Sequence, residues 1–184
     1  RRRGAPGLLT MTTGNGTKPR AAWIGLGANL PSRIGGPKET LEAARKRIGE
    51  LPDTQVTAVS SLYESAPVDA GGPPFINQVL RVETSLPALS LLEGLQAIEL
   101  AFGRERPFRN APRTLDLDLL LMADETRTDA VLTLPHPRLH ERLFVLMPLT
   151  EIDADLHVPG LGTAATLLEQ LLATKHGQDC RRLA

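Results

Sequence analysis

TLDLDLLLM, residues 114–122, alternates between polar residues and leucine. A period of two is typical of a β-strand, because successive side chains of a strand point to opposite faces of its sheet. In such a strand Asp116 and Asp118 share one face, with Cα atoms roughly 6.6 Å apart, and the alternate leucines face the other side. The stretch therefore predicts a strand that directs two carboxylates toward one patch.

The chain upstream of this strand predicts three more strands and two helices. AAWIGL (21–26) is an apolar run broken by glycines and predicts the first strand. PKETLEAARKRIGEL (37–51) and PALSLLEGLQAIELAFG (87–103) carry apolar residues at helical spacing and open with proline, so both are expected to be helices. A β-branched stretch at 56–61 and FINQVLRVETS (75–85) predict two strands that pair as antiparallel neighbours.

This order of elements, β-α-β-β-α-β, is the split arrangement of a ferredoxin-like fold, in which the helices cover one face of one sheet. Residues 135–152 and 163–175 also look helical, with Thr163 as the expected N-cap of the second. These C-terminal helices are expected to cover the other face. We therefore expect an α+β protein with three layers, α/β/α.

The composition indicates one domain that acts on small molecules. The 184 residues are 41% hydrophobic, enough for one buried core. Residues 1–20 are rich in Gly, Pro, Thr and charge and are expected to be a disordered tail, which places the domain at 21–184. Basic and acidic residues number 21 each, so no net field favours nucleic acid or an anionic membrane. No apolar run approaches the ~20 residues that span a bilayer. The single cysteine, Cys180, suits a reducing compartment, and we expect a cytoplasmic monomer.

The two aspartates are candidate metal ligands. Mg²⁺ usually binds one or two carboxylates together with substrate phosphates. Taken alone, the pair is equally well explained as a solvated acidic face, since short motifs match by chance. Four arginines precede the strand, at positions 104, 106, 109 and 113. The planar guanidinium of arginine can bind phosphate oxygens bidentately, and a solvated basic loop is the alternative explanation of the cluster. Magnesium polyphosphate needs both signs of charge in one place, so the combination indicates a nucleotide site.

Other site patterns receive less support. No G-x-x-x-x-G-K-[ST] is present, and GLGANL (25–30) lacks the third glycine of the dinucleotide-binding fingerprint. His136 and His140 are four residues apart, a spacing that zinc ligands use, but Pro137 lies between them and no third ligand is apparent. For His136 a contact with a phosphate or a base is the favoured interpretation.

Four motifs, in this order, carry a family resemblance: GLGANL at 25–30, FIN at 75–77, APRTLDLDLL at 111–120 and PHPRLHERLF at 135–144. Together they resemble the 6-hydroxymethyl-7,8-dihydropterin pyrophosphokinases of folate biosynthesis, over about residues 21–173. The resemblance implies transfer of the β,γ-pyrophosphoryl group of ATP to the hydroxymethyl group of the pterin, release of AMP, and two bound Mg²⁺ ions.

The resemblance also implies residue roles. Asp116 and Asp118 would hold the metals, and Arg104, Arg106 and Arg113 would act with them in catalysis. The implied nucleotide contacts are Gln96, Glu99, Arg104, Arg113, Leu119, Thr133, His136 and Arg142. The implied pterin contacts are Ser65, Ala66, Pro67, Val68, Phe75, Asn77 and Phe144.

The pterin contacts have a physical basis of their own. The amide of Asn77 offers an acceptor and donors to the edge of a heterocycle, and Phe75 and Phe144 offer flat surfaces to flank its ring. Core packing is the alternative for both phenylalanines. Asn77, in an otherwise apolar strand, is harder to explain as packing, because a buried amide needs partners.

One stretch departs from the family's pattern. Asn110 and Ala111 stand where many members have Trp-Gly, and the preceding loop is one residue shorter, so the separate roles of Arg104, Arg106 and Arg109 stay open. Two other functions are also open at this point. One is a different Mg²⁺-dependent enzyme acting on nucleotide phosphates, and the other is a ferredoxin-like binding module. Neutral charge and 3% aromatic residues argue against an RNA-binding module.

Overall fold

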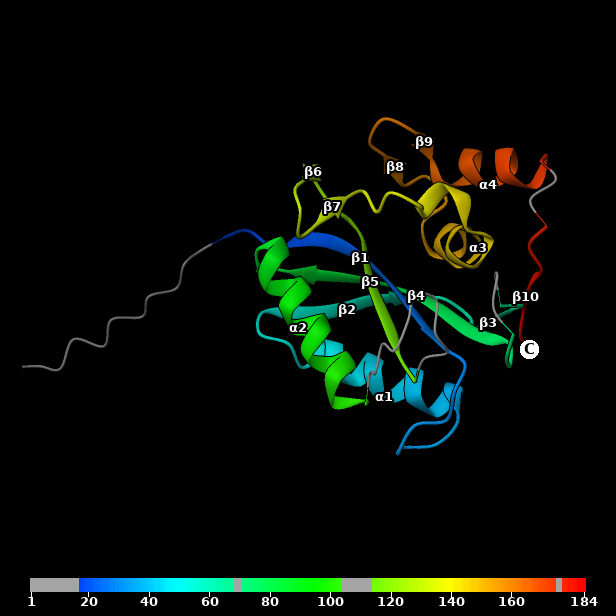
Figure 1. Ribbon diagram of the computed structural model, residues 1–184. Helices are drawn as coiled ribbons and strands as arrows, with labels where there is room; N and C mark the ends of the chain where they lie inside the picture. The colour runs from blue at the N-terminus through cyan, green and yellow to red at the C-terminus, as the bar shows by residue number, and fades with distance from the viewer. Residues whose placement is uncertain (1–16, 68–70, 104–113, 175–176) are drawn as a thin grey trace, which may run out of the picture.

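One β-sheet lies between two pairs of helices (Figure 1). The computed structural model describes residues 17–67, 71–103, 114–174 and 177–184. Helices α1 (Pro37–Gly49) and α2 (Ala88–Ala101) cover one face of the sheet. Helix α3 (Leu143–Ile152) packs on the other face, and α4 (Ala164–Leu172) packs against α3. The predicted three layers are confirmed.

The main sheet is antiparallel throughout. Its strands are β1 (Arg20–Ala28), β2 (Thr54–Val59), β3 (Tyr63–Ser65), β4 (Phe75–Thr84), β5 (Asp116–Met122) and β10 (Cys180–Arg182). The order is β10-β3-β4-β1-β5, and β2 also pairs with β4. Strands β2, β4, β1 and β5, with α1 and α2, form the predicted ferredoxin-like unit. Strand β3 takes the half of β4 that β2 leaves unpaired, and β10 extends the sheet beyond it.

Strand alternation divides the apolar residues into two cores. Between the sheet and helices α1 and α2, Ile24, Leu80 and Leu117 pack with Leu41 and Leu91. Between the sheet and helices α3 and α4, a second core contains Trp23, Val79, Leu121, Leu146 and Leu167. Each face of the sheet is therefore covered by apolar packing, as the helix patterns predict.

Strand β5 does not alternate to its end. Trp23 of β1 pairs with Leu121 and Ile24 pairs with Leu119, so Leu120 is an extra residue, a β-bulge. Leu119 packs in the first core, whereas Leu120 and Leu121 pack in the second. The bulge allows a run of four consecutive apolar residues to be buried on both faces. It leaves Asp116 and Asp118 before the bulge, in regular alternation.

The region after β5 differs in part from its prediction. Helix α3 begins only at Leu143, preceded by a 3₁₀ turn at Leu139–Glu141, so the helix predicted from residue 135 was wrong over its first part. Pro135 and Pro137 cannot continue a backbone hydrogen-bond ladder, and Arg142 is extended at φ −117° and ψ 112°. The predicted N-cap of α4 is confirmed, because the Thr163 hydroxyl accepts a hydrogen bond from the N–H of Thr166 at 3.2 Å.

Two small hairpins were not predicted. They are β6 (Arg127–Thr128) with β7 (Thr133–Leu134), and β8 (His157–Val158) with β9 (Gly162–Thr163).

Among the helices of the described segments, none has the length and apolar character needed to cross a membrane.

A carboxylate ties α3 to the edge of the sheet. Glu151 of α3 accepts hydrogen bonds from the Tyr63 hydroxyl at 2.6 Å and from the Ser61 hydroxyl and N–H at 2.8 and 3.0 Å. Desolvation acts to raise the pKa of Glu151, but these hydrogen bonds outweigh it and hold the pKa below the usual value. The ionised carboxylate is therefore the form that stabilises the packing of α3 on β3.

Glu151→Gln should lower the free energy of unfolding at pH 7 by roughly 1 kcal/mol, because an amide replaces a charged acceptor of three hydrogen bonds. A carboxylate whose pKa is depressed on folding stabilises above its unfolded pKa and loses that effect as the pH falls. The gap between wild type and variant should therefore narrow below about pH 4.5. Urea unfolding, followed by the fluorescence of Trp23, the single tryptophan, measures the free energy of unfolding of both proteins at each pH.

Glu169→Gln, at an exposed position on α4, is the matched control and should unfold like wild type at every pH. An equal loss of stability in the two variants would contradict the assigned role of Glu151.

Candidate active site

A row of paired residues crosses the sheet and sets the geometry of the site. Asp116 of β5 pairs with Gly27 of β1, Gly27 pairs with Asn77 of β4, and Asn77 pairs with Tyr63 of β3. Directly paired residues of antiparallel strands project from the same face. That face carries α3, because the Tyr63 hydroxyl reaches Glu151 there. Asp116 and Asn77 therefore face the same space beside α3, with a glycine between them.

Glycine keeps the surface between these two side chains open. A Cβ on Gly27 would lie 3.3 Å from Oδ1 of Asn77, tighter than ordinary contact. Gly25, two residues before Gly27 in β1, occupies the equivalent place between Asp118 and Val79. The two glycines of β1 thus form a floor without side chains, bordered by the carboxylates of β5 and by the buried amide of β4.

The carboxylates meet a guanidinium on this face. Nη1 of Arg142 lies 3.5 Å from Oδ2 of Asp118, and both side chains are partly exposed. The Arg142 guanidinium also lies over the ring of Phe144, 5.7 Å from its centroid. Positive and negative groups from β5 and from the start of α3 therefore lie next to each other, as a site for magnesium polyphosphate requires.

The ligand set fits Mg²⁺ better than a metal held by protein alone. No group of three or more His, Cys, Asp or Glu side chains gathers into a metal cage in the parts of the chain that the structure describes. Asp116 and Asp118 offer hard oxygen ligands on one face, and Mg²⁺ commonly completes its shell with phosphate oxygens and water. The two carboxylates are thus suited to a metal that arrives with a phosphate ligand.

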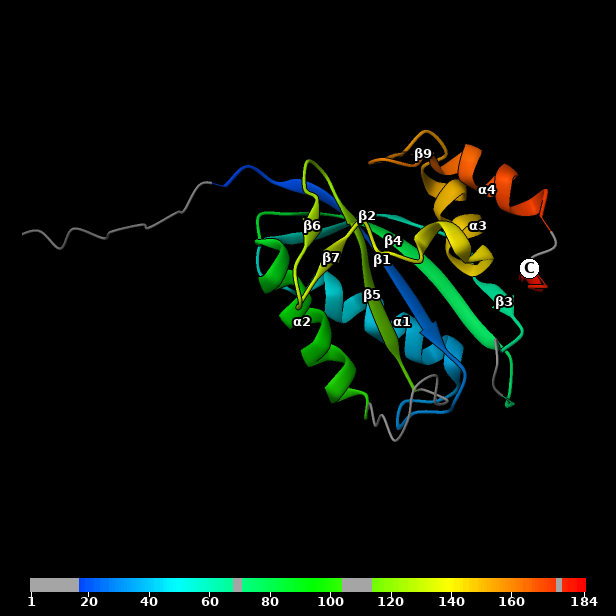
Figure 2. The ribbon, with the colours of Figure 1, turned by 45° about the horizontal axis from the view of Figure 1, so that its top comes forward.

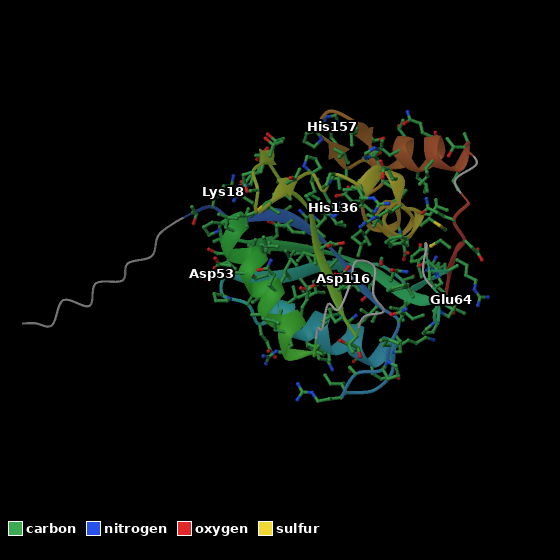
Figure 3. All side chains as sticks on the ribbon, viewed as in Figure 1. Lys18, Asp53, Glu64, Asp116, His136 and His157 are labelled. Atoms are coloured by element: carbon green, nitrogen blue, oxygen red, sulfur yellow. The ribbon has the colours of Figure 1, made fainter. Side chains whose placement is uncertain are left out.

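His136 lies in the segment between β7 and α3 and interacts electrostatically with Asp116, which Figure 3 labels with it. The backbone N–H of His136 donates to the carbonyl of Leu120, the bulge residue of β5, at 2.8 Å. Burial lowers the pKa of His136 to about 4, helped by Arg142 and opposed by Asp116. Its Nδ1 accepts the N–H of Arg138 at 3.1 Å, so the neutral ring carries its proton on Nε2. At neutral pH His136 is a hydrogen-bond donor without charge.

The structure brings together part of the predicted pterin set. Asn77 and Ser65 are 4% and 5% exposed, and Nδ2 of Asn77 donates to the Ser65 hydroxyl at 2.8 Å. Within the described residues, Oδ1 of Asn77 accepts no hydrogen bond, and it borders the glycine floor. Phe75 projects from the same face of β4, two residues before Asn77, and Phe144 lies in the first turn of α3. Both rings are only partly buried, so each keeps surface for a ligand.

Four of the predicted nucleotide contacts, Gln96, Glu99, Leu119 and Thr133, lie on or near the outer edge of β5. This strand is the last of the described sheet, with the β6–β7 hairpin beside it (Figure 2). Glu99 of α2 is 1% exposed, and its Oε1 accepts the outward N–H of Leu117 at 2.7 Å. Leu119 buries its side chain in the first core, but its backbone lies on the same edge as that of Leu117, because strand groups alternate. Thr133 lies nearby on β7, and Gln96 is exposed one turn before Glu99.

Some predicted residues are not brought into this arrangement. Ala66 is exposed and Pro67 half-buried at the end of β3. Val68, Arg104, Arg106, Arg109 and Arg113 lie outside the described residues, as do residues 1–16 of the tail predicted at residues 1–20. His140 faces Glu141 rather than His136, with Nε2 3.9 Å from Oε1, so the described geometry does not pair the two histidines on a metal.

Sequence reasoning missed three contributors to the site. Gly27 acts as the floor, a role visible only in the strand register. Asn29 is buried and donates to the carbonyl of Pro73 at 3.3 Å, which joins the end of β1 to the loop before β4. Gln178 reaches the start of α3 from the C-terminal segment. The motif GLGANL contains the first two, but its spacing does not assign their partners.

Comparison with known proteins identifies the family of the chain. Residues 23–154 match the family model described as 7,8-dihydro-6-hydroxymethylpterin-pyrophosphokinase (HPPK). The chain is 42% identical over 150 residues to the 2-amino-4-hydroxy-6-hydroxymethyldihydropteridine pyrophosphokinase of Haemophilus influenzae, covering 81% of this chain and 91% of that protein. The Pseudomonas aeruginosa enzyme of the same name is 43% identical over 138 residues, covering 74% of this chain and 83% of that protein.

A solved structure shares the fold. The wild-type Plasmodium falciparum HPPK-DHPS matches with a TM-score of 0.66 at 13% identity, covering 90% of this chain and 48% of that one, so the chain spans about half the length of that protein. The family model and the two bacterial relatives carry the assignment by sequence. The chain belongs to the 7,8-dihydro-6-hydroxymethylpterin-pyrophosphokinase family.

Proposed function

We propose that the chain binds ATP with two Mg²⁺ ions at Asp116 and Asp118 and transfers the β,γ-pyrophosphoryl group to 6-hydroxymethyl-7,8-dihydropterin, releasing AMP. As a member of the HPPK family it is a transferase, a pyrophosphokinase of folate biosynthesis. The observation that supports the residue roles most strongly is the row Asp116–Gly27–Asn77. It puts a carboxylate that can bind a metal and an amide that can bind a heterocycle on one face of the sheet, on either side of a glycine.

The pterin end of the site is assigned to β3, β4 and α3. Asn77 donates to Ser65 and keeps Oδ1 for an N–H at the edge of the heterocycle. Phe75 and Phe144 supply flat surfaces from the sheet and from the helix that covers it. With the ring against Asn77, its hydroxymethyl group is directed across Gly27 toward Asp116. The family resemblance likewise implies that Asp116 lies close to the reacting hydroxymethyl oxygen.

The nucleotide end is assigned to the outer edge of β5. Backbone groups of Leu119 and the side chains of Gln96 and Thr133 are suited to the ribose and the base, because hydrogen bonds there need no positive charge. The predicted nucleotide contact of Glu99 stays a prediction, since this side chain is 1% exposed and accepts the N–H of Leu117. Arg142 and the neutral His136 are suited to the phosphates, one as a cation and the other as a donor. The predicted roles of Arg104, Arg106 and Arg113 at the phosphates stay predictions.

In the proposed mechanism, catalysis depends mainly on the alignment of the two bound substrates. The pterin hydroxyl attacks the β-phosphorus in line with the departing AMP, and no covalent enzyme intermediate is needed. Mg²⁺ held at Asp116 and Asp118 would neutralise part of the phosphate charge. Asp116 and Asp118 fix the position of that charge, Arg142 adds a guanidinium beside it, and Asn77 holds the acceptor in register. α3 forms one wall of the space, so its packing on β3 also shapes the site.

Other properties follow as expectations. We propose a single domain over residues 21–184, since α4 and β10, beyond the family-model match, pack with the same sheet layers. We also propose a monomer in the cytoplasm. One half-buried cysteine and balanced charge are consistent with that setting.

The direct test of the activity is product analysis. With ATP, Mg²⁺ and the hydroxymethyl dihydropterin, AMP and the pterin pyrophosphate should appear together in equal amounts. Release of ADP, or of AMP without pterin, would instead identify a different phosphate enzyme.

Asp118→Asn should reduce turnover by at least about a hundredfold, because an amide is a weak substitute for an anionic ligand of Mg²⁺. Pterin binding should change little, since the side chains assigned to the pterin are Asn77 and the two phenylalanines and do not include this carboxylate. Steady-state kinetics and calorimetry of pterin binding measure the two effects. Asp124→Asn is the matched control, at an exposed turn residue with φ 59° that asparagine accepts readily. Full activity in Asp118→Asn would refute the metal site.

Gly27→Ala should raise the KM for pterin by roughly tenfold or more, because the new methyl group fills the floor and lies 3.3 Å from Oδ1 of Asn77. Affinity for an ATP analogue should fall much less, since the nucleotide is assigned to the other edge of β5. Gly49→Ala, where a Cβ meets Val56 at an ordinary 3.6 Å, is the control and should leave both values unchanged. A selective loss of nucleotide affinity in Gly27→Ala would contradict this layout.

A further inference from the structure

Gln178 bridges two backbone groups on either side of Arg142. Its Oε1 accepts the N–H of Leu143 at 2.9 Å, and its Nε2 donates to the carbonyl of Glu141 at 2.7 Å. The two bonds have opposite polarity, which only a side-chain amide supplies in this arrangement. Gln178 lies in the C-terminal segment, outside residues 23–154 that match the family model.

These bonds act at the junction between the 3₁₀ turn and α3, where the carbonyl of Arg142 already accepts the N–H groups of Val145 and Leu146 at 3.1 and 3.0 Å. Arg142 is the residue between the 3₁₀ turn and α3, in an extended conformation, and its own side chain does not cap α3. Leu143 is the first residue of α3, so its N–H has no partner within the helix. Gln178 therefore supplies the missing cap from a distant part of the chain. It fixes the backbone conformation from which the Arg142 side chain extends toward Asp118.

The segment that carries Gln178 is itself anchored on the pterin side. The carbonyl of Asp179 accepts the N–H of Ala66 at 3.3 Å, and β10 pairs with β3, with Cys180 opposite Ser65. One short segment thus contacts both the strand of Ser65 and the start of α3. The position of the Arg142 guanidinium is coupled by this route to the strand that borders the pterin site.

We propose that Gln178 is a positioning residue that acts through Arg142, holding its guanidinium beside Asp118 for the phosphates of the bound nucleotide. Gln178 touches neither substrate. The proposal depends on the proposed function only for the identity of the nucleotide.

A double-mutant cycle tests this assignment. The four proteins are wild type, Gln178→Met, Arg142→Ala and the double variant, and methionine keeps the length of glutamine without its hydrogen bonds. The main measurement is the Kd, with Mg²⁺, of the ATP analogue that has a methylene bridge between the α- and β-phosphates. Gln178→Met should weaken analogue binding by roughly five- to tenfold in the wild-type background and by less than about twofold in the Arg142→Ala background. In turnover the same variant should raise the KM for ATP and leave the KM for pterin unchanged.

Two further variants separate positioning from general stability. Gln178→Glu keeps an acceptor for the Leu143 N–H and should bind the analogue more tightly than Gln178→Met. Arg181→Ala removes the exposed ion pair, at 2.6 Å, between β10 and Glu64 of β3, and this variant should bind the analogue like wild type. Urea midpoints from Trp23 fluorescence verify that each variant is folded.

Equal losses for Gln178→Met in both backgrounds, or no loss in either, would overturn the proposal. The same holds if Arg181→Ala weakens binding as much as Gln178→Met does. Failure of the proposed function looks different: wild type would bind the analogue but release no AMP in response to pterin. The binding cycle would then still decide the role of Gln178.

Discussion

The register of β1 between β4 and β5 is the constraint on which the site depends. Backbone pairing alone brings Asp116 and Asn77, 39 positions apart in the printed sequence, to opposite sides of Gly27. The pairing fixes which face each side chain takes, because strand side chains alternate. The glycine then determines whether the space between them is filled. No special loop or metal cluster is needed to assemble this part of the site, and the layers of helices only enclose what the sheet has already arranged.

Much of this could be predicted from local pattern. The periods of two and of 3.6 predicted the strands and helices of the ferredoxin-like unit, and the alternation at residues 114–119 predicted that both carboxylates share a face. The pattern could not predict the bulge at Leu120, because a run of leucines has no period. It also missed β3 and β10, which are three residues each and depend on pairing partners rather than on their own sequence.

The site divides in the same way. Residue chemistry indicated the metal pair and the buried amide, and the resemblance indicated which substrates they serve. Neither residue chemistry nor the resemblance could assign a role to Gly27 or Gln178, because a single glycine and a single glutamine form no recognisable sequence pattern. Their roles come from what lies 3 Å away across the fold. Leu119 is a further example: its side chain belongs to the core, and what it offers at the strand edge is backbone, which residue type does not reveal.

The bulge in β5 makes this strand sensitive to its length in a way that its composition does not suggest. Leu119 packs in the first core, and Leu120 and Leu121 pack in the second. Each of them is replaceable by another apolar residue of similar size. A deletion or insertion between Asp118 and Leu120 would have a larger effect. It would shift the register by one, turn both carboxylates toward α1 and α2, and expose leucines toward α3. Among relatives, β5 should therefore vary in side chain while its spacing from the carboxylates to the bulge stays constant.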